Sequence, residues 1–260
     1  MFALGGDAFP NDTLGLRAAI ARAVGAGEGA IVIGGPFPSL DTMRMNLTGV
    51  RLDSRTPPAT AAEIAGGGFF SRVLDITAEP ALLASIPIHI RLHAEDCVFA
   101  FGIAADGTRA AWLRSCANGM FEASAATADI EAALLVLARE AASKHGAEVE
   151  SVRLTLDAEG PRGIAVTAVA VAKAMFFTAT LTIRGRVALD DEFNLRLGES
   201  TCTGDGMIAN LAAAQLRPRL AELEKRAFSI RSFLPVGLRA ADVTMAGGAA
   251  LQIRATMGAG

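Results

Sequence analysis

The segment that most constrains the fold is residues 163–185, GIAVTAVAVAKAMFFTATLTIRG, the most apolar stretch of the chain. A run of about 20 apolar residues is long enough to cross a bilayer as a helix. Its second half, however, alternates between an apolar and a polar side: Met175, Phe177, Ala179, Leu181 and Ile183 against Thr178, Thr180, Thr182 and Arg184. A helix in lipid would not segregate threonines with a period of two, so the stretch is interpreted as one long, bent β-strand.

Four further segments alternate in the same way and predict strands with one buried face and one solvated face. They are residues 86–93, 149–157, 192–199 and 250–257. Within residues 40–54 the apolar positions change parity at Gly49, which predicts a bulge or a sharp bend there. Residues 54–68, SRTPPATAAEIAGGG, are interpreted as a linker because proline and glycine punctuate them.

Three segments have the apolar spacing and the ends of helices. The first is residues 12–24, with Asn11 or Asp12 as its N-cap and Gly25 as its stop signal. Residues 127–145 and 205–225 follow, and Pro218 predicts a kink in the last of them. The expected apolar stripes are Leu16, Ile20 and Val24, then Ile130, Leu134, Leu137, Ala138 and Ala141, then Ile208, Leu211, Ala212, Leu216, Leu220 and Leu223.

These elements together predict an α+β fold. The expected architecture is a long, strongly curved antiparallel β-sheet wrapped around long amphipathic helices. A helix followed by strands begins near residue 12 and again near residue 127, which leaves two pseudo-repeated halves open. The corresponding domains are residues 1–125, a β-rich half with one leading helix, and residues 126–260, a helix–strand–helix–strand half. One continuous elongated domain is the alternative.

Composition excludes some classes of function. The net charge is -3 and no basic patch is present, so we expect no nucleic-acid partner, which would require clustered Lys and Arg. Hydrophobic residues make up 52% of the chain, which is more than an ordinary soluble domain carries. The cysteines Cys97, Cys116 and Cys202 are odd in number and widely spaced, so they are interpreted as buried free thiols.

No residue pattern predicts catalysis. His89 and His93 lie near Glu95, Asp96 and Cys97, but on a strand the two histidines would be about 13 Å apart, so the sequence favours a solvated face and no metal site. The acidic run Asp190, Asp191 and Glu192 separates two alternating segments and is interpreted as a hairpin turn. No nucleophile has a patterned base partner. We therefore expect a protein that is not an enzyme and that needs no cofactor.

The C-terminal half resembles a known superfamily. The phrases that carry the likeness are LTIRGRVALDDEFNLRL, LEKRAFSIRSFLPVGL and DVTMAGGAALQI, with LTGVRLDS as an echo in the first half. In order and spacing these resemble the tubular lipid-binding superfamily, which includes bactericidal/permeability-increasing protein and small bacterial lipid-binding modules. The resemblance implies a bent sheet around a long helix, an apolar channel, and the binding of a lipid or another hydrophobic molecule for transport or storage.

The resemblance implies that the side chains lining such a channel are those on the apolar sides of the C-terminal strands. Each of them is equally compatible with an ordinary packed core. A peripheral contact with a membrane and a homodimer are also left open. The candidate ligand-binding residues are Met175, Phe177, Leu181, Ile183, Leu195, Leu197, Leu251, Ile253 and Met257.

Two other classes of function stay open. The first is a helix-grip-like ligand-binding protein or cyclase, which would show a deep pocket with a convergent polar pair. The second is a structural or assembly module with a solid core and an exposed apolar patch. The N-terminal residues lack a basic region before an apolar run, so the sequence as written predicts a cytoplasmic protein, or a periplasmic one if a leader was removed.

Overall fold

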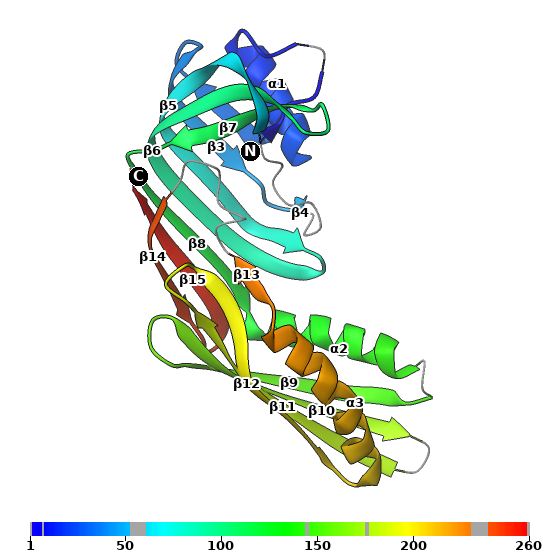
Figure 1. Cartoon of the computed structure of the whole chain (residues 1–260). Coiled ribbons are helices and arrows are strands. Elements are labelled where there is room, and N and C mark those ends of the chain that lie inside the picture. The colour runs from blue at the N-terminus through cyan, green and yellow to red at the C-terminus, as the bar shows by residue number, and fades with distance from the viewer. Residues whose placement is uncertain are drawn as a thin grey trace. The chain divides into compact units, whose positions relative to one another are not determined.

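The computed structural model describes residues 2–6, 8–52, 61–143, 146–174, 177–229 and 239–258, apart from the side chains of 61–65, 174, 177, 207–208, 228–229 and 239–240 (Figure 1). The chain divides into two compact units. The first comprises residues 1–123, 231–243 and 254–260, and the second comprises residues 124–230 and 244–253. The C-terminal segments therefore contribute to both units.

Helix α1 (Thr13–Val24) of the first unit confirms the first predicted helix, including both of its ends. The Asp12 carboxylate accepts a hydrogen bond from the backbone N–H of Gly15, at 2.6 Å, and so caps the first turn. Gly25 ends the helix at a φ of 67°, a conformation that glycine adopts without steric cost. Leu16 and Ile20 are fully buried.

The first unit contains most of a ten-stranded sheet. The main path of this sheet runs in the order β14-β15-β8-β6-β5-β3-β2. Strand β4 pairs with β5, and β7 pairs with both β6 and β1. Strands β3 and β4 run parallel to β5, so the prediction of a purely antiparallel sheet is wrong. The bounds are β1 Phe2–Ala3, β2 Ile31–Gly34, β3 Ser39–Asn46, β4 Arg51–Leu52, β5 Ala61–Leu83, β6 Ile86–Ala104, β7 Arg109–Ser115, β8 Asn118–Ala126, β14 Arg239–Ala246 and β15 Ala250–Gly258.

Strand β5 begins inside the segment interpreted as a linker. Residues 61–68 pair with β6, so that interpretation is wrong for them, while residues 54–60 lie outside the described part of the chain. The glycines that suggested a linker accommodate a shift of register between Ile64 and Gly68. Gly49 has a φ of 80° between β3 and β4, which confirms the predicted bend.

The core of the first unit is aromatic on one side of this sheet. Phe99 stacks on Phe69 with ring centroids 4.4 Å apart, and Phe2 lies 6.1 Å from Phe99. Phe9 stacks on Phe101 at 5.0 Å. Because α1 covers the same cluster with Leu16 and Ile20, the helix and the sheet share one hydrophobic core.

The second unit is a five-stranded antiparallel sheet, in the order β13-β12-β11-β10-β9, with two helices. Residues 163–185 form most of a hairpin: β10 and β11 pair from Gly163↔Ala188 to Ala174↔Phe177. The prediction of one long, bent strand is therefore wrong. The bounds are α2 Thr127–Ser143, β9 Glu148–Ala158, β10 Gly163–Ala174, β11 Phe177–Leu189, β12 Asn194–Asp205, α3 Met207–Glu224 and β13 Ala227–Ser229.

Helices α2 and α3 confirm that the second and third predicted helices exist, although α3 begins later than expected because Asp205 still pairs with Thr180 in the sheet. Their predicted apolar stripes are only partly buried. Leu137 is 61% exposed and Leu211 is 66% exposed. Helix α2 contacts β9, and α3 contacts β12 and β11, so part of each stripe has no strand beneath it.

The expected architecture as a whole is also wrong. Strands dominate the described residues, the sheets are open, and the longest helix has 18 residues. No described helix is enclosed by a sheet. The physical reason is visible in α3, where only Ala209 and Ala213 are fully buried among the described side chains, so this helix has too narrow a buried face to serve as the centre of a wrapped sheet.

Candidate functional site

The five-stranded sheet of the second unit has one apolar face. Directly paired residues on antiparallel strands point to the same side, so the register identifies this face. Leu154, Ala168 and Ile183 form one row across β9, β10 and β11. We call the full set the apolar face: Val152, Leu154, Leu156, Ile164, Val166, Ala168, Ala170, Leu181, Ile183, Val187, Leu189, Leu195 and Leu197.

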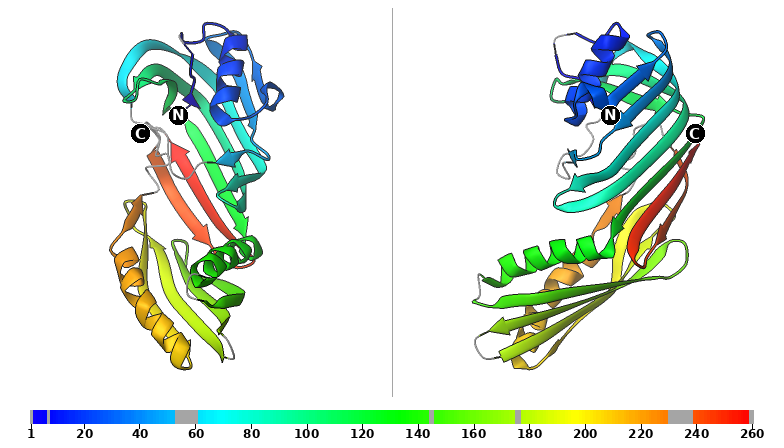
Figure 2. Two further views of the ribbon diagram at one scale, coloured as in Figure 1. Left: turned by 90° about the vertical axis from the view of Figure 1, so that its right-hand side faces the viewer. Right: turned by 180° about the vertical axis from the view of Figure 1, so that it is seen from behind.

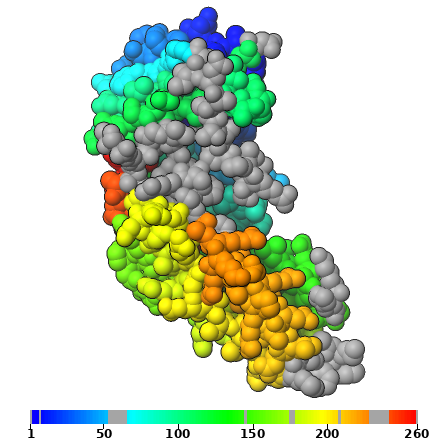
Figure 3. All heavy atoms as spheres, viewed as in Figure 1, coloured from blue at the N-terminus to red at the C-terminus, as the bar shows by residue number. Residues whose placement is uncertain are grey.

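Helices α2 and α3 lie over different strands of this sheet (Figure 2). Helix α2 packs on β9, and α3 packs on β12 and β11. In the described part of the chain neither helix makes extensive contact with β10. Helix α3 approaches the apolar face closely at Gly204, where a side chain would meet the backbone of Ala209. In Figure 3 the outer side of α3 lies open beside β12.

The middle of the apolar face is consequently only half-buried. Val166, Ala168 and Ala170 on β10 keep part of their surface exposed, as do Leu181 and Ile183 on β11. Residues near the ends of the face, such as Leu156 and Leu189, are buried. A contiguous, partly exposed apolar strip of this kind is typical of a surface that binds something apolar.

The structure brings four of the candidate ligand-binding residues together. Leu181, Ile183, Leu195 and Leu197 all belong to the apolar face and are half-buried. Leu251 and Ile253 lie half-buried on β15 within the second unit. Met257 is buried in the core of the first unit and is therefore not with the others. Met175 lies outside the described residues, as does the side chain of Phe177.

Sequence reasoning missed the polar contacts that hold the helices in place. Glu131 and Arg139 of α2, and Arg217 and Glu224 of α3, bond to backbone groups of the outer strands. A signal was present, since each helix places a glutamate and an arginine about two turns apart. It was not distinctive, because such pairs are common on solvated helices.

The first unit carries a separate polar cluster on β3, β5 and β6. His93 Nδ1 lies 2.7 Å from Asp75 Oδ1, and Arg44 Nε lies 3.5 Å from Asp75 Oδ2. These groups line a shallow depression of about 460 Å³ in which Thr77 supplies the only hydroxyl among the lining residues. Among the described residues no group of His, Cys, Asp and Glu is arranged to hold a metal ion. The cluster is an exposed set of cross-strand polar contacts.

The three cysteines are buried free thiols, as the sequence predicted. Burial raises the pKa of Cys97 to about 12. A thiol with so high a pKa is not ionised near neutrality, so Cys97 has little nucleophilic character. Burial also raises the pKa of Cys116 and of Cys202.

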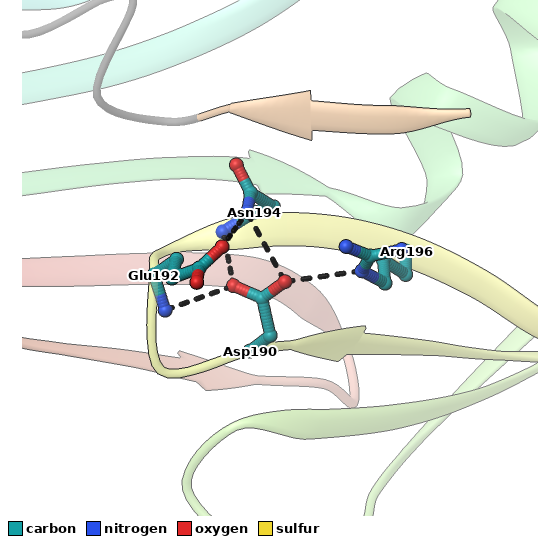
Figure 4. Close-up of polar contacts among 4 residues, drawn as sticks. All are labelled: Asp190, Glu192, Asn194 and Arg196. Carbon is teal, nitrogen blue, oxygen red and sulfur yellow. Dashed lines mark hydrogen bonds and ion pairs between the residues drawn. The ribbon is translucent and has the colours of Figure 1, made fainter.

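The acidic run at residues 190–192 forms the β11–β12 turn, as predicted (Figure 4). The Asp190 carboxylate accepts hydrogen bonds from the backbone N–H groups of Glu192 and Asn194, at 3.0 and 2.8 Å. It also accepts one from Arg196 Nε at 3.0 Å. These bonds to the charged form lower the pKa of Asp190 to about 2, led by the bond from the Asn194 backbone. Asp190 is a structural carboxylate of the turn.

Replacement of Asp190 by asparagine is therefore expected to destabilise the protein in a pH-dependent way. The folded pKa is below the ordinary value of 3.8, so the carboxylate stabilises the fold above about pH 4 and loses that effect as the pH falls towards about 2. Urea unfolding of both proteins at several pH values measures this. Asp191→Asn is the matched control, because Asp191 is fully exposed and its ion pair with Arg162 is therefore expected to contribute little. An Asp190→Asn effect that is the same at pH 2 and pH 7 would contradict the assignment.

Two further findings bear on what the protein is. In the described part of the chain no helix is both long enough and apolar enough to span a membrane. Comparisons of the chain with protein-family models, with curated proteins and with solved structures found no match, so similarity assigns it to no family and the site itself must support any function.

Proposed function

We propose that the second unit binds the apolar part of a lipid or of a similar hydrophobic molecule on the apolar face, for transport or storage. The observation that carries the proposal is the half-exposure of this face over β10 and β11, between α2, which packs on β9, and α3, which packs on β12 and on part of β11. The sequence resemblance to tubular lipid-binding proteins supports the same class of ligand. The resemblance remains a prediction.

The energetics of the face suit an apolar ligand. Covering about 200 Å² of apolar surface would contribute about 5 kcal/mol, at about 25 cal/mol per Å². The residues named as the apolar face include no charged or hydrogen-bonding group, and the register adds only the buried thiol of Cys202 opposite Ile183, so the face would give little directional specificity. A helix-grip-like binder or cyclase would instead use a convergent polar pair, and no such pair lies on this face among the described residues.

Native mass spectrometry of the purified protein, followed by extraction and identification of lipids, tests the proposal directly. We expect co-purified lipid near one equivalent, or uptake of added palmitate by delipidated protein. A clean apo mass with no uptake would favour the remaining alternative, a structural module that uses its exposed apolar residues to dock on another protein.

A blocking substitution localises the binding. Ala168→Phe would place a ring in the middle of the apolar face, and we expect it to lower palmitate occupancy about tenfold by filling the exposed strip. Thr167→Phe is the matched control, because Thr167 is the preceding residue of β10, is also half-buried and points to the opposite face. Titration of both variants by native mass spectrometry measures the difference. Equal occupancy in the two variants would exclude the apolar face as the binding site.

A further inference from the structure

Helix α2 is bonded to the edge of the sheet. Strand β9 is an edge strand, and its outward backbone groups need partners. The N–H of Leu154 donates to Glu131 Oε1 at 2.6 Å. Arg139 Nε donates to the carbonyl of Val149 at 2.9 Å, and a second guanidinium nitrogen donates to the carbonyl of Glu150 at 3.4 Å. The glutamate thus accepts from a backbone N–H group of the edge strand, and the arginine donates to two of its backbone carbonyl groups.

Helix α3 repeats the arrangement on β12. The backbone N–H of Ser200 donates to Glu224 Oε1 at 2.6 Å, and hydrogen bonds from Ser200 lower the pKa of Glu224. Arg217 Nε donates to the carbonyl of Cys202 at 3.1 Å. Strand β13 pairs with β12 only at residues 194–196, so α3 serves the part of this edge that has no neighbouring strand among the described residues.

The two helices differ in how their bonded side relates to their apolar residues. At about 100° per residue, Glu131 and Arg139 lie more than about 100° around α2 from the exposed Leu137. On α3 the bonded side and the buried apolar side coincide, since the fully buried Ala213 lies within about 40° of both Arg217 and Glu224. Charge-assisted bonds therefore hold one side of each helix to a strand, and on α3 they act together with the buried Ala209 and Ala213.

The geometry points to two edge clamps, Glu131 with Arg139 and Arg217 with Glu224. They hold α2 over β9 and α3 over β12 and β11, and so set how much of the apolar face is left free for a ligand. This inference rests on the proposed function. Because α3 also contacts β11, the free strip is about one to two strands wide, or about 5–10 Å, which suits an alkyl chain lying along β10. The four residues are positioning residues, since they act on the ligand only through the helices.

Hydrogen exchange of the ligand-free protein tests the clamps without any ligand. In Glu131→Ala we expect the Leu154 amide and the amides of α2 to exchange about tenfold faster, because a charge-assisted bond is lost. Glu131→Gln keeps an acceptor oxygen and should restore slow exchange. Glu140→Ala is the matched control on the same helix, since Glu140 is exposed. Glu224→Ala and Glu224→Gln repeat the test on the other edge, with Arg219→Ala as the control.

Palmitate occupancy, measured by native mass spectrometry on the same variants, completes the test. Faster exchange together with at least a threefold change in occupancy supports the inference, and unchanged exchange overturns it. Faster exchange with unaltered palmitate binding would overturn the link between the clamps and the ligand face. Faster exchange in a protein whose wild type binds no palmitate would support the clamps and overturn the lipid-binding function.

Discussion

Replacing Phe99 by alanine is expected to lower the free energy of unfolding of the first unit by about 3–5 kcal/mol. Phe99 is 3% exposed, and its ring stacks on Phe69 at an interplanar angle of 11°. Removal of the ring would take away both its apolar burial and its aromatic contacts, and the closely packed cluster would close the cavity only in part. Because domains of this kind are stable by only about 5–15 kcal/mol, a loss of this size would unfold a large part of the population at moderate denaturant.

Guanidinium unfolding followed by tryptophan fluorescence measures this loss, since Trp112 is the only tryptophan of the chain and is buried in the first unit. Val98→Ala is the matched control. Val98 precedes Phe99 on β6 but is 42% exposed, so its truncation should cost less than about 0.5 kcal/mol. Similar losses in the two variants would mean that β6 does not bury the face assigned to it.

Local signals in the sequence predicted several elements well. The cap at Asp12 and the stop at Gly25 fixed α1 at both ends because each acts through a backbone bond or a backbone conformation of its own. Strict alternation predicted β9 and β12 for the same local reason. The parallel pairing of β3 with β5 could not be predicted, because alternation shows which faces are buried and does not identify the neighbouring strand.

The hairpin formed by β10 and β11 was missed for a definable reason. In β10 both faces carry apolar residues, such as Ala168 on one side and Val169 and Val171 on the other, so the parity of the strand could not be read. The residues between the strands, Met175 and Phe176, are not turn formers, so no punctuation separated the halves. The pairing of β10 with β11, and not a turn signal in the sequence, therefore marks where the apolar stretch divides into two strands.

The sequence predicted the strand residues of the candidate site, and it did not predict where the helices lie on them. Alternation had already grouped Leu181 with Ile183, and Leu195 with Leu197, and register places all four on one face. Where the helices lie on that face depends on bonds from Glu131 and other side chains to edge backbone groups. Such bonds leave no periodic trace in a sequence, so the helix stripes were expected to be more deeply buried than they are.

Substitution of Gly204 by alanine is expected to lower the free energy of unfolding of the second unit by about 1–3 kcal/mol. Gly204 pairs with Leu181, and a Cβ atom there would overlap the backbone of Ala209 in the first turn of α3. Backbone atoms cannot rotate away as a flexible side chain does, so α3 must move off the sheet or β12 must distort.

Gly198→Ala separates this effect from the general cost of changing a glycine in β12, because a Cβ atom at Gly198 meets nothing within 4 Å and should change stability by less than about 0.5 kcal/mol. Urea unfolding followed by circular dichroism compares the variants, and hydrogen exchange shows whether α3 loosens. If α3 bounds the ligand face, the displaced helix of Gly204→Ala must also alter palmitate occupancy. Normal stability and normal exchange in Gly204→Ala would mean that α3 does not rest on the sheet at this point, and the apolar face would then lose one of its two boundaries.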